Sequence, residues 1–201
     1  MLKSTEIRWF LEGKIPMNVT RFLKETGLDI SENRTDHYLL VQGCDNIGIK
    51  IRNSRLEIKR RLDMQPYHIS KMNISGNIEW WERWAWNDKT TCSEIEQLIY
   101  KDNKNPWIKI EKRRWQKKFT VHDNVLIPVP SQVLNSDLAM EITELRLNRK
   151  SWWTIGFDLF TGADRSSLDL VIERYPVKNL GVELNEEWSF GYPCWLSHVV
   201  T

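Results

Sequence analysis

The stretch IGIKIRNSRLEIKRR, from Ile47 to Arg61, decides the fold because polar and apolar residues alternate on both sides of a short polar turn. A two-residue turn at Asn53 and Ser54 places Lys50 opposite Glu57, and successive side chains of each strand then point to opposite sides. One face is apolar and carries Ile49, Ile51, Leu56 and Ile58. The other face is charged and carries Lys50, Arg52, Arg55, Glu57, Lys59 and Arg61. The pattern predicts a β-hairpin whose two faces need different surroundings.

Similar alternation recurs along the rest of the chain. Strands are expected within residues 5–12, 36–41, 74–86, 106–121, 138–147 and 151–160. Helical spacing of apolar residues predicts helices within 15–27, 91–100 and 164–175. Seven or eight long strands with a few helices indicate a mainly β fold, in which the strands either stack as a sandwich or close into a barrel.

The composition excludes several classes of protein. The net charge of +2 is too small for a nucleic-acid coat, and no apolar run approaches the roughly 18 residues that cross a bilayer. Cys44, Cys92 and Cys194 lack a CxxC spacing, which together with the charged start of the chain favours a reduced, cytoplasmic protein. The sequence has no P-loop, GxGxxG or zinc spacing, so no organic cofactor, nucleic acid or membrane partner is expected.

The alternation alone leaves open where the charged face of the hairpin points. In a sandwich this face meets water. In a barrel the apolar face lies outward under the helices, and the charged face lines a lumen in which buried charges must be paired or must bind an ion. Clustered Arg and Lys beside carboxylates suit a polyanion with Mg²⁺ or Mn²⁺, because guanidinium groups bind phosphate oxygens and carboxylates bind hard cations.

The order TEIRWF, KIRNSRLEIK, EKRRW, EITEL and WWTIGF resembles the CYTH or triphosphate tunnel superfamily, and the resemblance covers about Thr5 to Phe160. The resemblance implies an eight-stranded antiparallel tunnel with charged residues inside and helices outside. In many members it also implies hydrolysis of triphosphates or polyphosphate with a divalent metal. The N-terminal signature of the family is Glu-x-Glu-x-Lys, where this chain has Glu6, Arg8 and Phe10. The chain thus resembles a divergent member in which anion binding is expected and hydrolysis is left open.

We therefore predict an α+β, mainly β, single domain over residues 1–201. It is expected to be an antiparallel eight-stranded tunnel-like barrel with a few covering helices that binds a small phosphorylated or polyanionic ligand. The candidate anion-binding residues are Lys50, Arg52, Lys59, Arg61 and Arg113. The candidate catalytic or metal-binding carboxylates, for Mg²⁺ or Mn²⁺, are Glu6, Glu57, Glu111, Glu141 and Asp158. The register of residues 107–119 has two alternatives, which turn inward either Arg113 or the pair Lys112 and Arg114.

A second hypothesis rests on the eleven tryptophans of the chain. A non-catalytic barrel would use them to bind an apolar or aromatic ligand at its mouth, or a protein partner on a Trp-rich surface. Tryptophan is also an ordinary core residue, so packing alone is the competing interpretation. The residues concerned are Trp80, Trp81, Trp84, Trp152 and Trp153.

Overall fold

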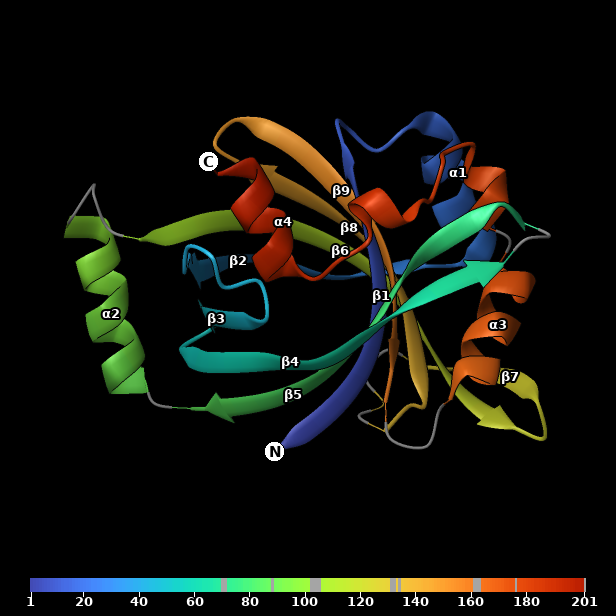
Figure 1. The fold of residues 1–201 in the computed structure, drawn as a ribbon, viewed down its shortest axis with the longest axis horizontal. Helices are drawn as coiled ribbons and strands as arrows, with labels where there is room; N and C mark the ends of the chain where they lie inside the picture. Colours follow the sequence, from blue (N-terminus) through green and yellow to red (C-terminus); the bar gives the residue numbers. More distant parts are fainter. Residues whose placement is uncertain are drawn as a thin grey trace.

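The computed structural model describes residues 1–69, 72–87, 89–101, 106–130, 133, 135–160, 164–175 and 177–200, without the side chains of residues 29–31 and 178. Nine strands within these ranges form one sheet in the order β2-β3-β4-β5-β1-β9-β8-β6-β7. Their bounds are β1 (Leu2–Glu12), β2 (Asp29–Leu39), β3 (Ile47–Arg52), β4 (Arg55–Ile69), β5 (Ile74–Trp86), β6 (Trp107–His122), β7 (Val125–Val129), β8 (Leu138–Leu147) and β9 (Lys150–Leu159). Neighbouring strands run antiparallel, and β2 also pairs with β6, which closes eight strands into a barrel with β7 at its side (Figure 1). The predicted mainly β barrel is confirmed.

The hairpin of β3 and β4 has the predicted register, with Lys50 opposite Glu57. Asn53 and Ser54 have φ angles of 48° and 55°, as expected for a two-residue turn that matches the twist of the strands. Ile51 is fully buried on the outward face, whereas the charged face lines the barrel interior. The alternative with the charges inside the barrel is therefore the one that this protein adopts.

Helices and the outward side chains of the strands form the larger apolar core. The helices are α1 (Met17–Thr26), α2 (Lys89–Lys101), α3 (Arg165–Arg174) and α4 (Tyr192–Val199), with the short 3₁₀ segments η2 (Val177–Leu180) and η3 (Glu186–Trp188). Ile7 of β1 and Ile155 of β9 pack in this core with Phe22 of α1 and Ile172 of α3. Because these outer faces are covered by helices, the strands bury their apolar residues outside the barrel and keep charged residues inside it.

A second apolar cluster fills one end of the barrel interior. Phe10 lies two positions after Arg8 on the inner face of β1, and it packs with Trp152 of β9 and with Trp195 and Leu196 of α4. Trp195 is fully buried and stacks on Phe10 with ring centroids 4.8 Å apart. Helix α4, which lies beside β3 in Figure 1, therefore closes this end and turns the tunnel into a cavity.

The helices of the described residues include none that is both long and apolar enough to cross a membrane.

Candidate functional site

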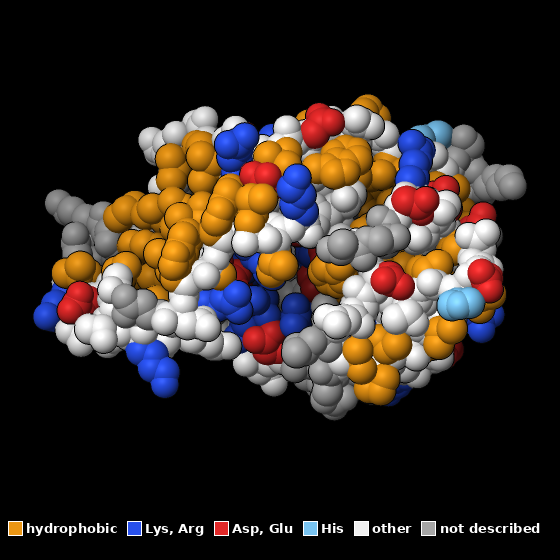
Figure 2. Space-filling view, turned by 90° about the horizontal axis from the view of Figure 1, so that it is seen from below, with side chains coloured by type: hydrophobic (Ala, Val, Ile, Leu, Met, Phe, Trp, Pro, Cys, Tyr) orange, Lys and Arg blue, Asp and Glu red, His pale blue; other side chains and the backbone are white. Residues whose placement is uncertain are grey.

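The barrel interior holds a cavity of about 710 Å³, which lies within the usual size range of small-ligand sites. Among the described residues, nine cationic and five acidic side chains line it, so this part of the lining carries an excess of positive charge. The cations are Lys3, Arg8, Arg34, Lys50, Arg52, Lys59, Arg83, Arg114 and Lys118, and the acids are Glu6, Glu57, Asp137, Glu141 and Asp158. Figure 2 shows a hollow on one face of the molecule in which blue and red side chains gather below an apolar rim.

Glu57 is the centre of a cluster in which three cations share one carboxylate. Its oxygens lie 3.2 Å from Lys50 Nζ, 2.9 Å from Arg52 Nη2 and 3.7 Å from Arg55 Nε. Burial would raise the pKa of Glu57, but Lys50 and Arg52 outweigh it and lower this pKa to about 2. Burial, followed by the charge of Arg52, lowers the pKa of Lys50 to about 8. The cluster therefore carries surplus positive charge at neutral pH, which an anionic ligand would balance.

Arg8 lies among three carboxylates on the inner face. Its Nη1 is 2.5 Å from Glu141 Oε1 and its Nη2 is 3.4 Å from Asp158 Oδ1. Glu6 is directly opposite Asp158 in the pairing of β1 with β9, and it is bonded to Lys59. Burial raises the pKa of Asp158 to about 7, with the negative charges of Glu6 and Glu141 adding to the effect. Arg8 thus neutralises Glu141 and Lys59 neutralises Glu6, whereas Asp158 tends to keep its proton.

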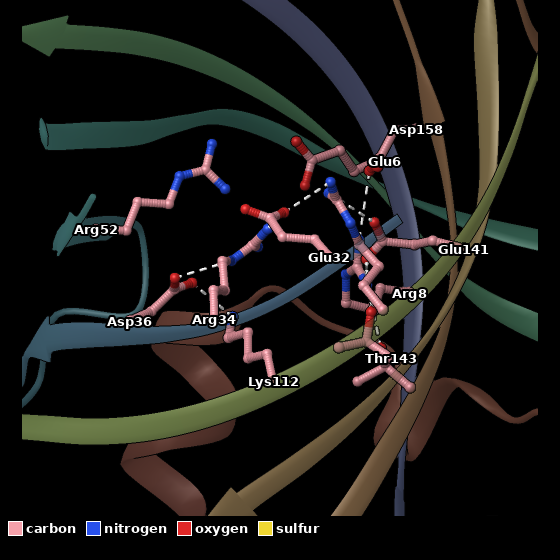
Figure 3. Close-up of polar contacts among 12 residues, drawn as sticks. Glu6, Arg8, Glu32, Arg34, Asp36, Arg52, Lys112, Glu141, Thr143 and Asp158 are labelled. Carbon is pink, nitrogen blue, oxygen red and sulfur yellow. Dashed lines mark hydrogen bonds and ion pairs between the residues drawn. The ribbon is translucent and has the colours of Figure 1, made fainter. Parts of the chain in front are cut away.

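A further ion-pair network crosses from β2 to β6. Asp36, which is fully buried, lies 2.9 Å from Arg34 Nε and 3.0 Å from Lys112 Nζ. Arg114 Nη2 is 3.0 Å from Glu32, which Arg34 also contacts. Burial lowers the pKa of Lys112 well below its usual value, although Asp36 opposes this. Figure 3 shows Glu32, Arg34 and Arg52 reaching into the same interior as Arg8, Glu6 and Asp158.

Most of the residues predicted from the hairpin and the neighbouring strands come together in the cavity. Lys50, Arg52 and Lys59 line it. Arg61 lies next to them, 2.6 Å from Glu79 and over the ring of Trp81. Four of the five predicted carboxylates also line the cavity, and these are Glu6, Glu57, Glu141 and Asp158.

Two predicted residues lie outside the barrel instead. Arg113 is exposed and covers the outer face of the Trp115 ring, 4.7 Å from its centroid. Glu111 is half exposed and pairs with Lys109 at 3.0 Å. Ile110 belongs to the interior apolar cluster. Lys112 and Arg114, which lie on the same face of β6 as Ile110, therefore point inward. Of the two sequence alternatives, the one with Lys112 and Arg114 inside is therefore correct, and the assignments of Arg113 and Glu111 to the site are corrected.

The five candidate tryptophans separate into different environments. Trp81 alone among them lines the cavity, beside Lys59. Trp152 and Trp153 are buried in the two apolar clusters, and Trp80 packs against the outer one. Trp84 is partly buried on β5. Most of these tryptophans therefore serve packing and do not line the cavity.

Sequence reasoning did not select several residues that line the cavity. Arg8 lies two positions after Glu6, so strand alternation could have placed both on one face. Arg34 and Tyr38 lie on β2, whose first half did not show a clear alternation. Tyr192 reaches the cavity from α4, and no local pattern indicates that a C-terminal helix enters a barrel. Its ring stacks on Tyr38 with centroids 5.4 Å apart.

The interior carboxylates do not suit the Mg²⁺ or Mn²⁺ that the resemblance implies. Such ions need several oxygen ligands at roughly 2.0–2.1 Å in an octahedron. The guanidinium of Arg8 already occupies the space between Glu141 and Asp158, and Lys59 contacts Glu6. Consistently, the described part of the chain contains no group of three or more His, Cys, Asp or Glu side chains that could hold a metal ion.

No protein-family model and no curated protein sequence matches the chain. Solved structures do match it. A candidate adenylyl cyclase from Hippeastrum, which has a dominant triphosphatase activity, aligns with a TM-score of 0.50 and 10% identity over 98% of this chain and 96% of that chain. The PH1012 protein from Pyrococcus horikoshii OT3 aligns with a TM-score of 0.46 and 14% identity over 92% of this chain and 93% of its own. The closed eight-stranded antiparallel barrel of this chain therefore has the same fold as the Hippeastrum protein.

Proposed function

We propose that this protein binds a small polyanion with phosphoryl groups, such as a triphosphate, inside the barrel. The single observation that carries the proposal is the charge of the cavity, where nine cationic side chains face five acidic ones among the described residues. Glu32 and Asp36 compensate part of this excess, but the Glu57 cluster keeps three cations around one carboxylate, and such buried surplus charge is costly unless an anion completes it. The fold supports the choice of a triphosphate as the first probe, because the Hippeastrum protein with this fold has triphosphatase activity.

The Glu57 cluster is the part of the lining best suited to a phosphoryl group. Arg52 offers a guanidinium group and Lys50 an ammonium group in the cavity wall, and Arg55 adds positive charge on the other side of Glu57. Guanidinium groups match pairs of phosphate oxygens, and each charge-assisted hydrogen bond contributes roughly 1.5–3 kcal/mol. Lys59 of β4 and Arg83 of β5 also line the cavity and would bind the neighbouring phosphoryl groups of an extended ligand.

The test is calorimetric titration of the protein with tripolyphosphate, in the wild type and in two arginine variants. Arg52→Ala removes a cation from the cavity, and Arg113→Ala removes the same charge from the outer surface of β6. Loss of one charge-assisted hydrogen bond in Arg52→Ala should raise the Kd for tripolyphosphate roughly 10- to 100-fold. We expect less than a twofold change for Arg113→Ala, since the exposed site is screened by salt.

Equal weakening by both substitutions would mean that the anion binds diffusely to surface charge. Failure of tripolyphosphate, pyrophosphate and nucleoside triphosphates to bind would refute the proposal. Quenching of tryptophan emission by an apolar ligand, in the same samples, would then favour the hypothesis of an aromatic ligand. A phosphate-release assay on the bound samples separates binding from turnover. The proposal itself concerns binding, because Arg8 engages the carboxylates that metal-assisted hydrolysis would require.

A further inference from the structure

Arg8 has the surroundings of a cation that is built into the site. The residue is 6% exposed, and its guanidinium lies in the cavity wall between carboxylates of two other strands, Glu141 of β8 and Asp158 of β9. Thr154 Oγ1 accepts a third hydrogen bond from Nη1 at 3.2 Å. Figure 3 shows Arg8 with Glu141 and Asp158 in the barrel interior.

The backbone beside Arg8 is shaped for this guanidinium. Gly156 is directly opposite Arg8 in the pairing of β1 with β9. A Cβ added at Gly156 would lie 2.8 Å from Arg8 Cζ and 2.9 Å from both terminal nitrogens, so any larger residue would collide with the group. The ring of Tyr192 adds another wall, with its centroid 5.5 Å from Cζ. A glycine at that position and an aromatic ring together hold the planar cation in one place.

The guanidinium of Arg8 occupies the position where a divalent cation would have to bind. An ion coordinated by Glu141 and Asp158 needs both carboxylates within bonding distance, and their oxygens are hydrogen-bonded to the two ends of one guanidinium. A divalent cation would also meet the full positive charge of Arg8 at close range. Arg8 cannot lose this charge under ordinary conditions, because it stays protonated and its carboxylate partners raise its pKa further.

We propose that Arg8 takes the role of the divalent cation, so that this barrel binds its polyanion without metal. This inference rests on the proposed function and concerns the same cavity. The fixed guanidinium neutralises Glu141 and Asp158. The surplus positive charge of Lys50 and Arg52, which share the single carboxylate Glu57, is then left to the ligand.

The first experiment uses the wild-type protein and Mn²⁺ alone. Binding is measured as loss of the free Mn²⁺ signal in electron paramagnetic resonance, in the absence of any anion. We expect no binding to the wild type. In Arg8→Ala the freed carboxylates Glu141 and Asp158 should bind Mn²⁺ and raise the Tm in its presence. Arg113→Ala is the matched control, because it removes the same charge from the outer surface and should gain no Mn²⁺ site.

The second experiment titrates the wild type with tripolyphosphate in buffer passed over a chelating resin, which avoids adding a chelator that is itself a polyanion. We expect the same Kd, within twofold, in this buffer and in buffer with Mg²⁺. Binding that requires Mg²⁺, or Mn²⁺ binding to the wild type that Glu141→Gln abolishes, would overturn the inference. If no anion binds at all, the proposed function fails, and the Mn²⁺ experiment still decides the role of Arg8. If Arg8→Ala does not fold, the wild-type measurements remain decisive.

Discussion

Asp158 is expected to destabilise the folded protein at pH 8, and Asp158→Asn is expected to relieve this. The side chain is 14% exposed and is directly opposite Glu6 across β1 and β9. Burial, Glu6 and Glu141 together raise its pKa from 3.8 to about 7. Asparagine has nearly the shape of the protonated carboxyl group and carries no charge at any pH.

The size of the effect follows from proton linkage. Between pH 4 and 7 the folded state holds a proton on Asp158 that the unfolded chain has lost, so stability falls as the pH rises. The stabilisation that comes from this raised pKa is fully present below the pKa of Asp158 in the unfolded chain. It is lost as the pH rises through the pKa of Asp158 in the folded protein. The shift of roughly three pKa units at about 1.4 kcal/mol each sets a ceiling of about 4 kcal/mol. Relaxation around the charge reduces the observed value below this ceiling.

The assay is urea unfolding of the wild type and of Asp158→Asn at several pH values from 4 to 8. We expect equal stability at pH 4 and a growing advantage of the variant up to pH 8. Subtracting the unfolding free energy of the wild type from that of Asp158→Asn at each pH cancels the contributions of the other titrating groups. Glu12→Gln, at the exposed end of β1, is the control and should show no such trend. A variant less stable than the wild type at pH 8 would refute the reasoning, because ionised Asp158 would then gain more from Arg8 than burial costs it.

Three other perturbations test the rest of the interior. Gly156→Ala should lower the free energy of unfolding by roughly 1–3 kcal/mol, because the added methyl group forces Arg8 aside. Urea unfolding measures this loss, which should be smaller when the substitution is made in Arg8→Ala. An equal loss in both backgrounds would contradict the contact between Gly156 and Arg8. Trp195→Ala should lower the free energy of unfolding by roughly 3–5 kcal/mol, because it leaves a cavity where the buried Trp195 ring stacks on Phe10. Trp188→Ala, at a more exposed tryptophan, is the comparison. Similar losses in both variants would argue against a special role of α4. Tripolyphosphate affinity should weaken in the wild type relative to Lys50→Arg as the pH rises past about 8, where Lys50 loses its charge and arginine does not. Calorimetry at pH 7 and 9 measures this ratio, and a ratio that stays constant would show that Lys50 remains charged or does not bind the anion.

Local pattern predicted the hairpin correctly, and it selected several residues that line the cavity. The alternation around Asn53 and Ser54 specified the pairing of Lys50 with Glu57, because a two-residue turn and a period of two leave one register. The same alternation placed Arg52 and Lys59 on the face of Lys50, and the structure brings all three into the cavity.

Alternation misled at β6, and the reason lies in another part of the chain. Ile108 and Ile110 suggest an apolar outward face, which would turn Arg113 inward. In the structure Ile110 points inward, because α4 and Phe10 make this end of the interior apolar. The polarity of a barrel interior changes along its axis, so one strand cannot reveal which of its faces is inside.

The sequence by itself determined the strands, the hairpin register and the sets of residues that share a face, since these depend on backbone periodicity and turn geometry. Only the tertiary structure decided that the charged faces enclose a cavity, that α4 closes one end of it, and that Arg8 meets Glu141 and Asp158 there. Those contacts join residues more than 130 positions apart in the chain. They exist because closure of the sheet and burial of apolar surface under the helices bring distant strands together, and no local pattern encodes that closure.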